Sequence, residues 1–196
     1  MPVMKCPACA SILEGPAEAC PTCKFTLRRL DPKFGTVPLH TRYLTDRSSS
    51  MTLDEVERLR DLLQRFETKF PQSVFSVFVT DLPAGTNIRE FTFWLANRAR
   101  FGSVEATGAQ NFDLLLVIDA ETHNAALTVG YGLEKFILED DLSVALAAAL
   151  PALRDGDLER GIRLCVEEMT RQLTDMCKAT SDASETPAAP MARETW

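Results

Sequence analysis

Four of the six cysteines lie within the first 23 residues, in a pattern that could bind a metal ion. Cys6 and Cys9 form one C-x-x-C pair, and Cys20 and Cys23 form a second pair ten residues later. A spacer of two residues allows a tight turn that directs both sulfurs at one ion, and two such turns complete a tetrahedral shell. We therefore predict a structural Zn²⁺ bound by four thiolates. Since all four ligands come from the protein, no coordination position remains for a substrate.

Two other interpretations of the cysteine pairs depend on the redox environment. The chain begins MPVMKCPACA, with no apolar signal stretch, and no apolar run approaches the roughly 18 residues of a membrane span. We therefore expect a cytoplasmic protein without a transmembrane segment, in which thiols stay reduced, and this disfavours a pair of disulfides. A redox-active C-x-x-C would follow a strand and open a helix, and neither pattern surrounds these pairs.

The overall charge argues against a generally basic nucleic-acid binder. The formal net charge is −7 and the sequence pI is about 4.9, so the chain as a whole would be repelled by nucleic acid. Its apolar fraction of 45% is ordinary for a globular protein. The stretch from Lys24 to Arg47 is nevertheless basic, with six Lys or Arg against two Asp. Contact with nucleic acid through the cysteine module and this basic stretch therefore stays open as a lesser alternative.

Regular periodicity begins at residue 52 and predicts alternating helices and buried strands. Thr52 and Glu55 fit a capping box at the start of a helix that Pro71 ends. Further helices are predicted over 88–99, over 142–150 with Pro151 as the stop, and over 158–176; strands are predicted over 74–79, 112–119 and 125–131, the last two as a hairpin. This order predicts a three-layer α/β/α sandwich. We expect a zinc ribbon at 1–30, a linker at 31–47, the sandwich at 48–178 and a disordered tail at 179–196.

Several phrases of the larger domain occur in an order that resembles a known family. They are YLTD at 43–46, FDLLLVI at 112–118, VGYGLE at 129–134 and LPALRDGDLERG at 150–161. Together they resemble the TPM domain family, which includes thylakoid-lumen phosphatase-like proteins linked to photosystem II repair and bacterial membrane-associated proteins. The resemblance implies a Rossmann-like α/β/α sandwich with metal binding at an acidic site, and acid phosphatase activity in some members.

The resemblance also implies residues for a second, acidic metal site. Asp46, Glu134 and Glu139 match acidic positions of the family, and Asn111 lies in the phrase Gln110-Asn111-Phe112, where the family usually reads Asp-Asn-Gly. Such a site would take Ca²⁺ or Mg²⁺, which prefer carboxylate oxygens, and we expect these acids to converge at the carboxyl ends of the strands. The alternative is that Glu134 and the acids from Glu139 onward favour the start of the next helix. Likewise, Gly130-Tyr131-Gly132 could contact a phosphate or form a turn.

The closed cysteine shell and the altered acidic phrases lead to one preferred function. We expect a non-catalytic factor that binds a protein partner in assembly or quality control. The first alternative is a metal-dependent acid phosphatase that hydrolyses phosphomonoesters, and the second is nucleic-acid contact through the zinc module.

Overall fold

The computed structural model describes residues 4–13, 17–99, 101, 112–134 and 136–184. Its elements in chain order are β1 (Met4–Lys5), β2 (Ile12–Leu13), the 3₁₀ turn η1 (Leu27–Arg29), α1 (Asp31–Phe34), β3 (Leu44–Asp46), α2 (Leu53–Lys69), β4 (Phe75–Thr80), α3 (Ile88–Arg98), β5 (Leu114–Asp119), β6 (Asn124–Val129), α4 (Glu139–Arg154) and α5 (Leu158–Ser184).

A mixed four-stranded sheet forms the centre of the molecule. Its strand order is β3-β4-β5-β6, with the first three strands parallel and β6 antiparallel to β5. Val129 at the end of β6 pairs with Leu114 at the start of β5, so the predicted hairpin is confirmed. The short strands β1 and β2 form a separate antiparallel pair within the cysteine segment.

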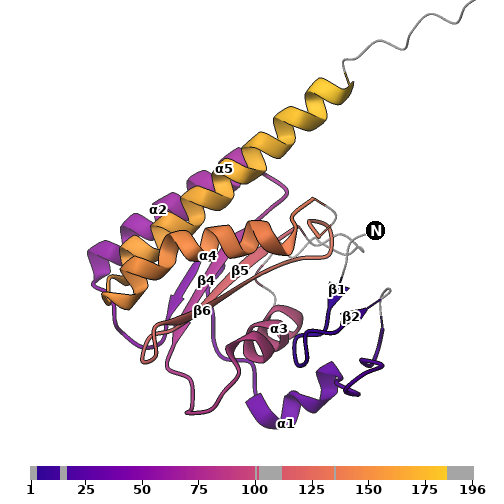
Figure 1. The fold of residues 1–196 in the computed structure, drawn as a ribbon. Coiled ribbons are helices and arrows are strands. Elements are labelled where there is room, and N and C mark those ends of the chain that lie inside the picture. The colour runs from indigo at the N-terminus through magenta and orange to yellow at the C-terminus, as the bar shows by residue number, and fades with distance from the viewer. Residues whose placement is uncertain (1–3, 14–16, 100, 102–111, 135, 185–196) are drawn as a thin grey trace, which may run out of the picture.

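Helices cover both faces of the sheet, which confirms the predicted three-layer sandwich (Figure 1). Alternate residues of each strand point to opposite faces. Val77 of β4 belongs to one apolar cluster with α2, α4 and α5, whereas Phe78 belongs to a second cluster with α3. The cysteine segment and the residues that follow it complete this second layer beside α3.

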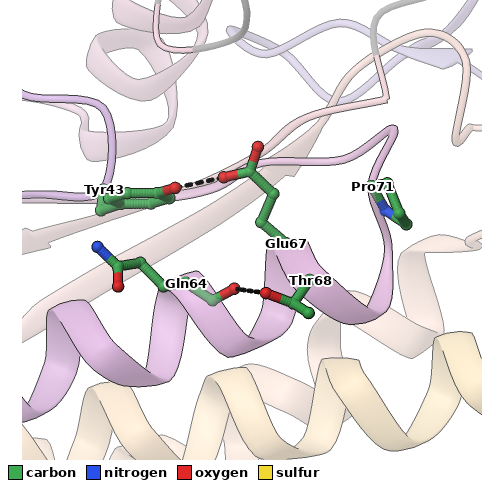
Figure 2. Close-up of a pocket in the computed structure, with 5 residues that line it drawn as sticks. All are labelled: Tyr43, Gln64, Glu67, Thr68 and Pro71. Carbon is green, nitrogen blue, oxygen red and sulfur yellow. Dashed lines mark hydrogen bonds between the residues drawn. The ribbon is translucent and has the colours of Figure 1, made fainter.

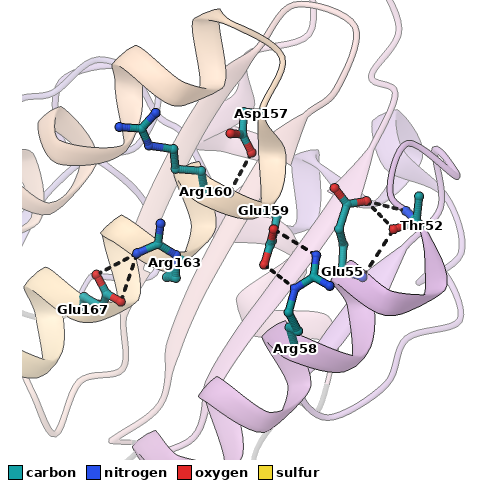
Figure 3. Close-up of polar contacts among 8 residues, drawn as sticks. All are labelled: Thr52, Glu55, Arg58, Asp157, Glu159, Arg160, Arg163 and Glu167. Carbon is teal, nitrogen blue, oxygen red and sulfur yellow. Dashed lines mark hydrogen bonds and ion pairs between the residues drawn. The ribbon is translucent and has the colours of Figure 1, made fainter.

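Helix α2 begins as its sequence predicts. The Thr52 hydroxyl accepts a hydrogen bond from the backbone N–H of Glu55 at 3.3 Å, and the Glu55 carboxylate accepts one from the N–H of Thr52 at 2.7 Å (Figure 3). These reciprocal bonds satisfy donors that have no partner inside the helix. The apolar stripe of α2 then buries Leu59, Leu63 and Phe66 against the sheet.

The prediction that Pro151 ends the helix after β6 is wrong, because α4 continues to Arg154. A proline in the last turn removes only one hydrogen bond of the helix, and the next two residues, Ala152 and Leu153, are buried in the core. Gly156 instead marks the end, with a positive φ of 79°. The N–H groups of Gly156 and Asp157 donate to the carbonyls of Leu153 (3.0 Å) and Ala152 (2.9 Å), which is a Schellman motif.

Two further boundaries differ from the sequence-based expectation. The last helix, expected to reach about residue 176, continues to Ser184. The segment expected to be a linker at 31–47 contains both α1 and β3, and Leu44 of β3 is buried in the main core. Pro32, Gly35 and Pro38 interrupt any period there, so these short elements leave no pattern in the sequence.

None of the described helices combines the length and the apolar character that crossing a bilayer demands.

Candidate metal centre

Each C-x-x-C pair lies in a turn of the same construction. In the first turn, the N–H of Cys6 donates to the carbonyl of Ser11 at 2.9 Å, and the N–H of Ala10 donates to the carbonyl of Cys6 at 2.8 Å. In the second, Cys20 donates to Phe25 and Lys24 donates back to Cys20, both at 2.9 Å. Ala10 and Lys24, each four residues after the first cysteine of its pair, share a φ of 58°. The two turns therefore present their sulfurs in equivalent ways.

The four sulfurs come together at the spacing that a single metal ion requires. Cys6 Sγ lies 3.7 Å from Cys23 Sγ, and Cys9 Sγ lies 3.7 Å from Cys20 Sγ. All four ligand atoms are within 4.8 Å of one another. A Zn–S bond of about 2.3 Å gives a sulfur–sulfur edge of about 3.8 Å in a tetrahedron, whereas a disulfide would need about 2.05 Å. The cysteines are free thiols, and together they could hold a metal ion such as zinc.

One of these thiols already favours the form that binds metals. Cys9 is exposed, and its hydrogen bond with the Ser11 side chain lowers the pKa of the thiol to about 6. The thiolate, not the thiol, is the metal ligand. Burial instead raises the pKa of the Cys23 thiol to about 12, so a metal ion bound by all four sulfurs must displace the proton of that thiol.

The cysteine segment packs directly onto α3. Cys6 and Cys20 are buried in one apolar cluster with Trp94 of α3, and Phe25 meets Phe93 edge-on with ring centroids 5.8 Å apart. Beyond the turns, Phe34 of α1 contacts Phe91 with ring centroids 5.2 Å apart. The cysteine segment therefore forms part of the sandwich's second outer layer.

A charged clamp joins α1 to α3 beside these rings. Arg98 donates two hydrogen bonds to the Asp31 carboxylate, at 2.8 and 2.7 Å, and the Trp94 indole N–H donates a third at 3.0 Å. The Arg98 bonds are the main reason that the pKa of Asp31 lies below its usual value. Because Asp31 opens α1, the clamp fixes this short helix against the domain.

Asp46 lies at the edge formed by the carboxyl ends of the parallel strands, but its oxygens are already occupied. Its carboxylate accepts hydrogen bonds from the N–H and hydroxyl of Ser48, at 3.0 and 2.7 Å, and from the N–H of Met51 at 3.1 Å. These bonds shape the loop between β3 and α2.

The other acidic residues expected at that edge lie elsewhere. Glu134 follows β6, which is antiparallel to β5. Glu134 therefore lies at the end of the sheet where the parallel strands begin, whereas Asp46 lies at the end where they finish. Glu139 opens α4 and forms an ion pair with Lys5 of the cysteine segment. Asn111 lies outside the described residues. The expected convergence of Asp46 with Glu134 and Glu139 is therefore not found, and among the residues with described positions only the cysteines form a group that could hold a metal ion.

Asp141 caps the start of α4. The Asp141 carboxylate accepts a hydrogen bond from the N–H of Leu138 at 2.8 Å, just before the first turn. Negative charge near a helix N-terminus is favourable in any case. The geometry of Asp141 therefore supports the interpretation that these acids stabilise the helix start.

The glycine phrase after β6 forms a turn. The N–H of Gly130 donates to the carbonyl of Asp113 at 2.8 Å, and the N–H of Leu133 donates back to the carbonyl of Gly130 at 2.9 Å. These bonds make the phrase a compact reversal that leads from the sheet to α4.

A pocket lies at the amino end of β3, against the last turns of α2 (Figure 2). Its volume is about 440 Å³. The Tyr43 hydroxyl donates to the Glu67 carboxylate, which also forms an ion pair with Arg42. The hydrogen bond to Glu67 raises the pKa of Tyr43 above its ordinary value. Because its charged groups already neutralise each other, this pocket offers no free charge to a ligand.

Sequence reasoning missed a group of exposed apolar side chains in the segment that runs from the end of β6 into the first turns of α4. We call it the 131–144 surface; its exposed side chains are Tyr131, Phe136, Leu138 and Val144. Each keeps about half or more of its side chain accessible. The segment is short and also carries four acidic residues, Glu134 and Glu139 to Asp141, but the exposure of its apolar side chains could not be predicted from the sequence.

Comparison with known proteins agrees with this fold. Residues 44–172 match the family model described as the TPM domain. No curated protein matches the chain. The solution NMR structure of the N-terminal domain of a P. gingivalis protein is 22% identical, with a TM-score of 0.60, covering 70% of this chain and 85% of its own.

Two other solved structures are similar in fold. The NMR structure of the BA42 protein from Bizionia argentinensis is 13% identical, with a TM-score of 0.55 over 64% of this chain and 83% of its own. The N-terminal domain of cg2496 protein from Corynebacterium glutamicum is 14% identical, with a TM-score of 0.52 over 83% of this chain and 94% of its own. The family match spans well over half of the sequence, and the chain belongs to the TPM domain family.

Proposed function

We propose that the chain is a non-catalytic factor that binds a protein partner through the 131–144 surface. The observation that carries this proposal is the exposure of four large apolar side chains in one short segment, each about half accessible or more. Soluble proteins seldom leave grouped apolar side chains in water unless a partner covers them.

The charges beside this surface indicate what the partner offers. The Glu134 carboxylate is half-buried and has no ion-pair partner among the described residues, and burial raises its pKa. Asp140 adds a second carboxylate on the first turn of α4. A partner segment with apolar side chains and a Lys or Arg would cover the apolar groups and neutralise Glu134.

Zinc in the cysteine centre has a structural role in this proposal. The four-sulfur shell leaves no open position for catalysis. The module it folds supports the second layer of the sandwich and, through the Lys5 ion pair with Glu139, contacts the start of α4 beside the 131–144 surface.

The binding proposal is tested by comparing matched surface variants. A partner captured by the wild-type chain should be lost when Leu138 and Val144 are both changed to serine, while the far-UV circular dichroism stays the same. Leu53→Ser is the control, since Leu53 is also an exposed leucine but lies at the start of α2. Equal capture by all three proteins would contradict the proposal.

The non-catalytic part of the proposal is tested with a generic phosphomonoester and added Ca²⁺, Mg²⁺ or Mn²⁺. Because Asp46 and Glu134 lie at opposite ends of the strands and cannot bind one metal ion together, we expect no metal-stimulated turnover. Turnover that Asp46→Ala abolishes would instead favour the phosphatase alternative.

A further inference from the structure

Strand β6 forms one edge of the main sheet. The strand order β3-β4-β5-β6 leaves its outer side without a neighbouring strand in the described part of the chain (Figure 1). Along an antiparallel pair, residues whose backbone groups bond to the neighbour alternate with residues whose groups face away. The N–H of Gly130 donates to the carbonyl of Asp113, so the groups of Ala125, Leu127 and Val129 face away from β5. They have no hydrogen bond to any described residue, and such an open row is a template for another strand.

Helix α4 lies beside this edge and turns one side away from the domain. On this face of the sheet, α4 packs against α5 and β6, and α5 packs in turn against α2, so α4 is the outermost helix. Leu153 of α4 lies against Gly161 of α5. Val144 precedes Leu153 by nine residues, or two and a half helical turns, so it lies on the side of α4 opposite to α5. Its side chain is half exposed.

This outward side of α4 carries a regular stripe of exposed residues. They recur at steps of four and three and are Asp140, Val144, Ala147, Pro151 and Arg154. Steps of four and three keep side chains on one side of a helix, and helices pair along such stripes. The middle of the stripe is apolar, whereas Asp140 and Arg154 give its ends opposite charges. Neither charge has an ion-pair partner among the residues whose positions are described.

The stripe is complementary to a second copy of itself that runs antiparallel. Asp140 and Arg154 each lie seven residues from Ala147. A two-fold axis beside Ala147 therefore brings Asp140 of each helix opposite Arg154 of the other. In the same way Ala125 and Val129 each lie two residues from Leu127, so two β6 edges can pair antiparallel. A parallel arrangement would instead place acid against acid.

We propose that the chain forms a symmetric homodimer through β6 and α4. The free edges of the two β6 strands pair, so that the two sheets become one continuous sheet, and the two α4 helices pack along their stripes. The proposal rests on the proposed function, because Val144 belongs to both surfaces. It names a second copy of this chain as the partner that covers this end of the 131–144 surface.

The test is analytical ultracentrifugation of the full metal-loaded chain over a range of concentrations. We expect association to twice the chain mass of 21.7 kDa. Ala147→Arg places a positive charge beside the axis, where it meets the same charge of the second copy, and should weaken association at least about tenfold. Ala179→Arg is the control, since Ala179 is an exposed alanine on α5 and should leave the dimer unchanged. Far-UV circular dichroism shows whether each variant keeps its fold.

Exchange of the two charges tests the antiparallel pairing itself. Asp140→Arg alone and Arg154→Asp alone each place like charges opposite each other and should weaken association about tenfold. The double variant restores opposite charges and should recover most of the loss. Ala125→Pro removes an N–H that faces away from β5, keeps the hydrogen bonds between β5 and β6, and should also weaken the dimer.

Two results would overturn the proposal. One is a chain that stays monomeric at every concentration, and the other is a dimer that neither Ala147→Arg nor the charge exchange affects. The proposed function has a separate readout, namely the loss of a captured partner when Leu138 and Val144 become serine. Capture by a monomeric chain would therefore leave the proposed function standing and remove the homodimer.

Discussion

At the scale of single residues, the last of the four family phrases has a structural explanation. In LPALRDGDLERG, Gly156 ends α4 and the Asp157 carboxylate accepts a hydrogen bond from the N–H of Arg160 at 3.0 Å, which caps α5 (Figure 3). Gly161 lies where α5 meets α4: a Cβ there would come within 2.5 Å of Leu153 Cδ2. The sequence pattern could be recognised in advance, but whether its residues pack or catalyse depended on contacts between two helices.

The first prediction concerns Gly161. Gly161→Ala should lower the free energy of unfolding by about 1–3 kcal/mol, because the fully buried Leu153 cannot move away from the added methyl group. Urea denaturation measures the change. In a Leu153→Ala background the same substitution should be neutral or stabilising, and a loss of equal size in both backgrounds would contradict the packing explanation.

The second prediction concerns the pH dependence of the Asp31 clamp. The Arg98 hydrogen bonds place the folded-state pKa of Asp31 below its unfolded value of about 3.9. The contribution of this group to stability is therefore fully present above about pH 4 and is lost as pH falls through the lower, folded-state pKa. Wild type and Asp31→Asn should differ in stability at pH 6 and converge at the acidic end of a denaturation series. A constant difference across the series would be inconsistent with this assignment.

At the scale of elements, sequence periodicity predicted the long helices and the central strands but not the short elements. The apolar stripe of α2 was predicted because it repeats over several turns, and the capping box was predicted because Thr52 and Glu55 have the residue types and spacing of that motif. Helix α1 and strand β3 were not predicted, since a four-residue helix and a three-residue strand are too short to show a period. The end of α4 was predicted wrongly at Pro151, because proline usually stops a helix. The burial of Ala152 and Leu153, which holds the last turn in place, cannot be seen in the sequence.

The third prediction follows from the position of Pro151 in α4. Pro151→Ala should raise the free energy of unfolding by about 1 kcal/mol, because the new N–H can donate to the carbonyl of Ala147 and alanine favours the helix. Pro83→Ala, in the turn after β4, is the control and should bring no gain. Thermal or urea unfolding of the two variants compares them, and destabilisation by Pro151→Ala would show that the ring makes contacts that the helix requires.

At the scale of the whole molecule, the cysteine centre belongs to the architecture of the domain. The spacing of the four cysteines predicted a metal centre, and the structure brings their sulfurs together. The sequence could not show that Cys6 and Cys20 share an apolar cluster with Trp94, because that contact joins distant parts of the chain. The predicted hairpin did imply that Glu134 leaves the sheet at the end opposite to the carboxyl ends of the parallel strands, but β3, which contains Asp46, was too short to be predicted.

The fourth prediction counts accessible thiols. In the metal-loaded chain, only the exposed Cys177 should react quickly with an alkylating reagent, because the metal protects the four ligands and burial raises the pKa of Cys165 to about 12. Removal of the metal with a chelator should make the four ligand cysteines reactive as well, and Cys165 should react only after unfolding. Mass spectrometry gives the count at each stage. Rapid labelling of the four cysteines before chelation would contradict a closed metal shell.

Zinc content together with X-ray absorption at the zinc edge tests the central claim most directly. If the four cysteines bind one zinc ion, the purified chain should contain one zinc surrounded by four sulfurs at about 2.3 Å. A Cys6→Ser/Cys20→Ser variant should lose this sulfur signal. Zinc well below one per chain, or a shell of oxygen and nitrogen ligands instead of sulfur, would contradict the account.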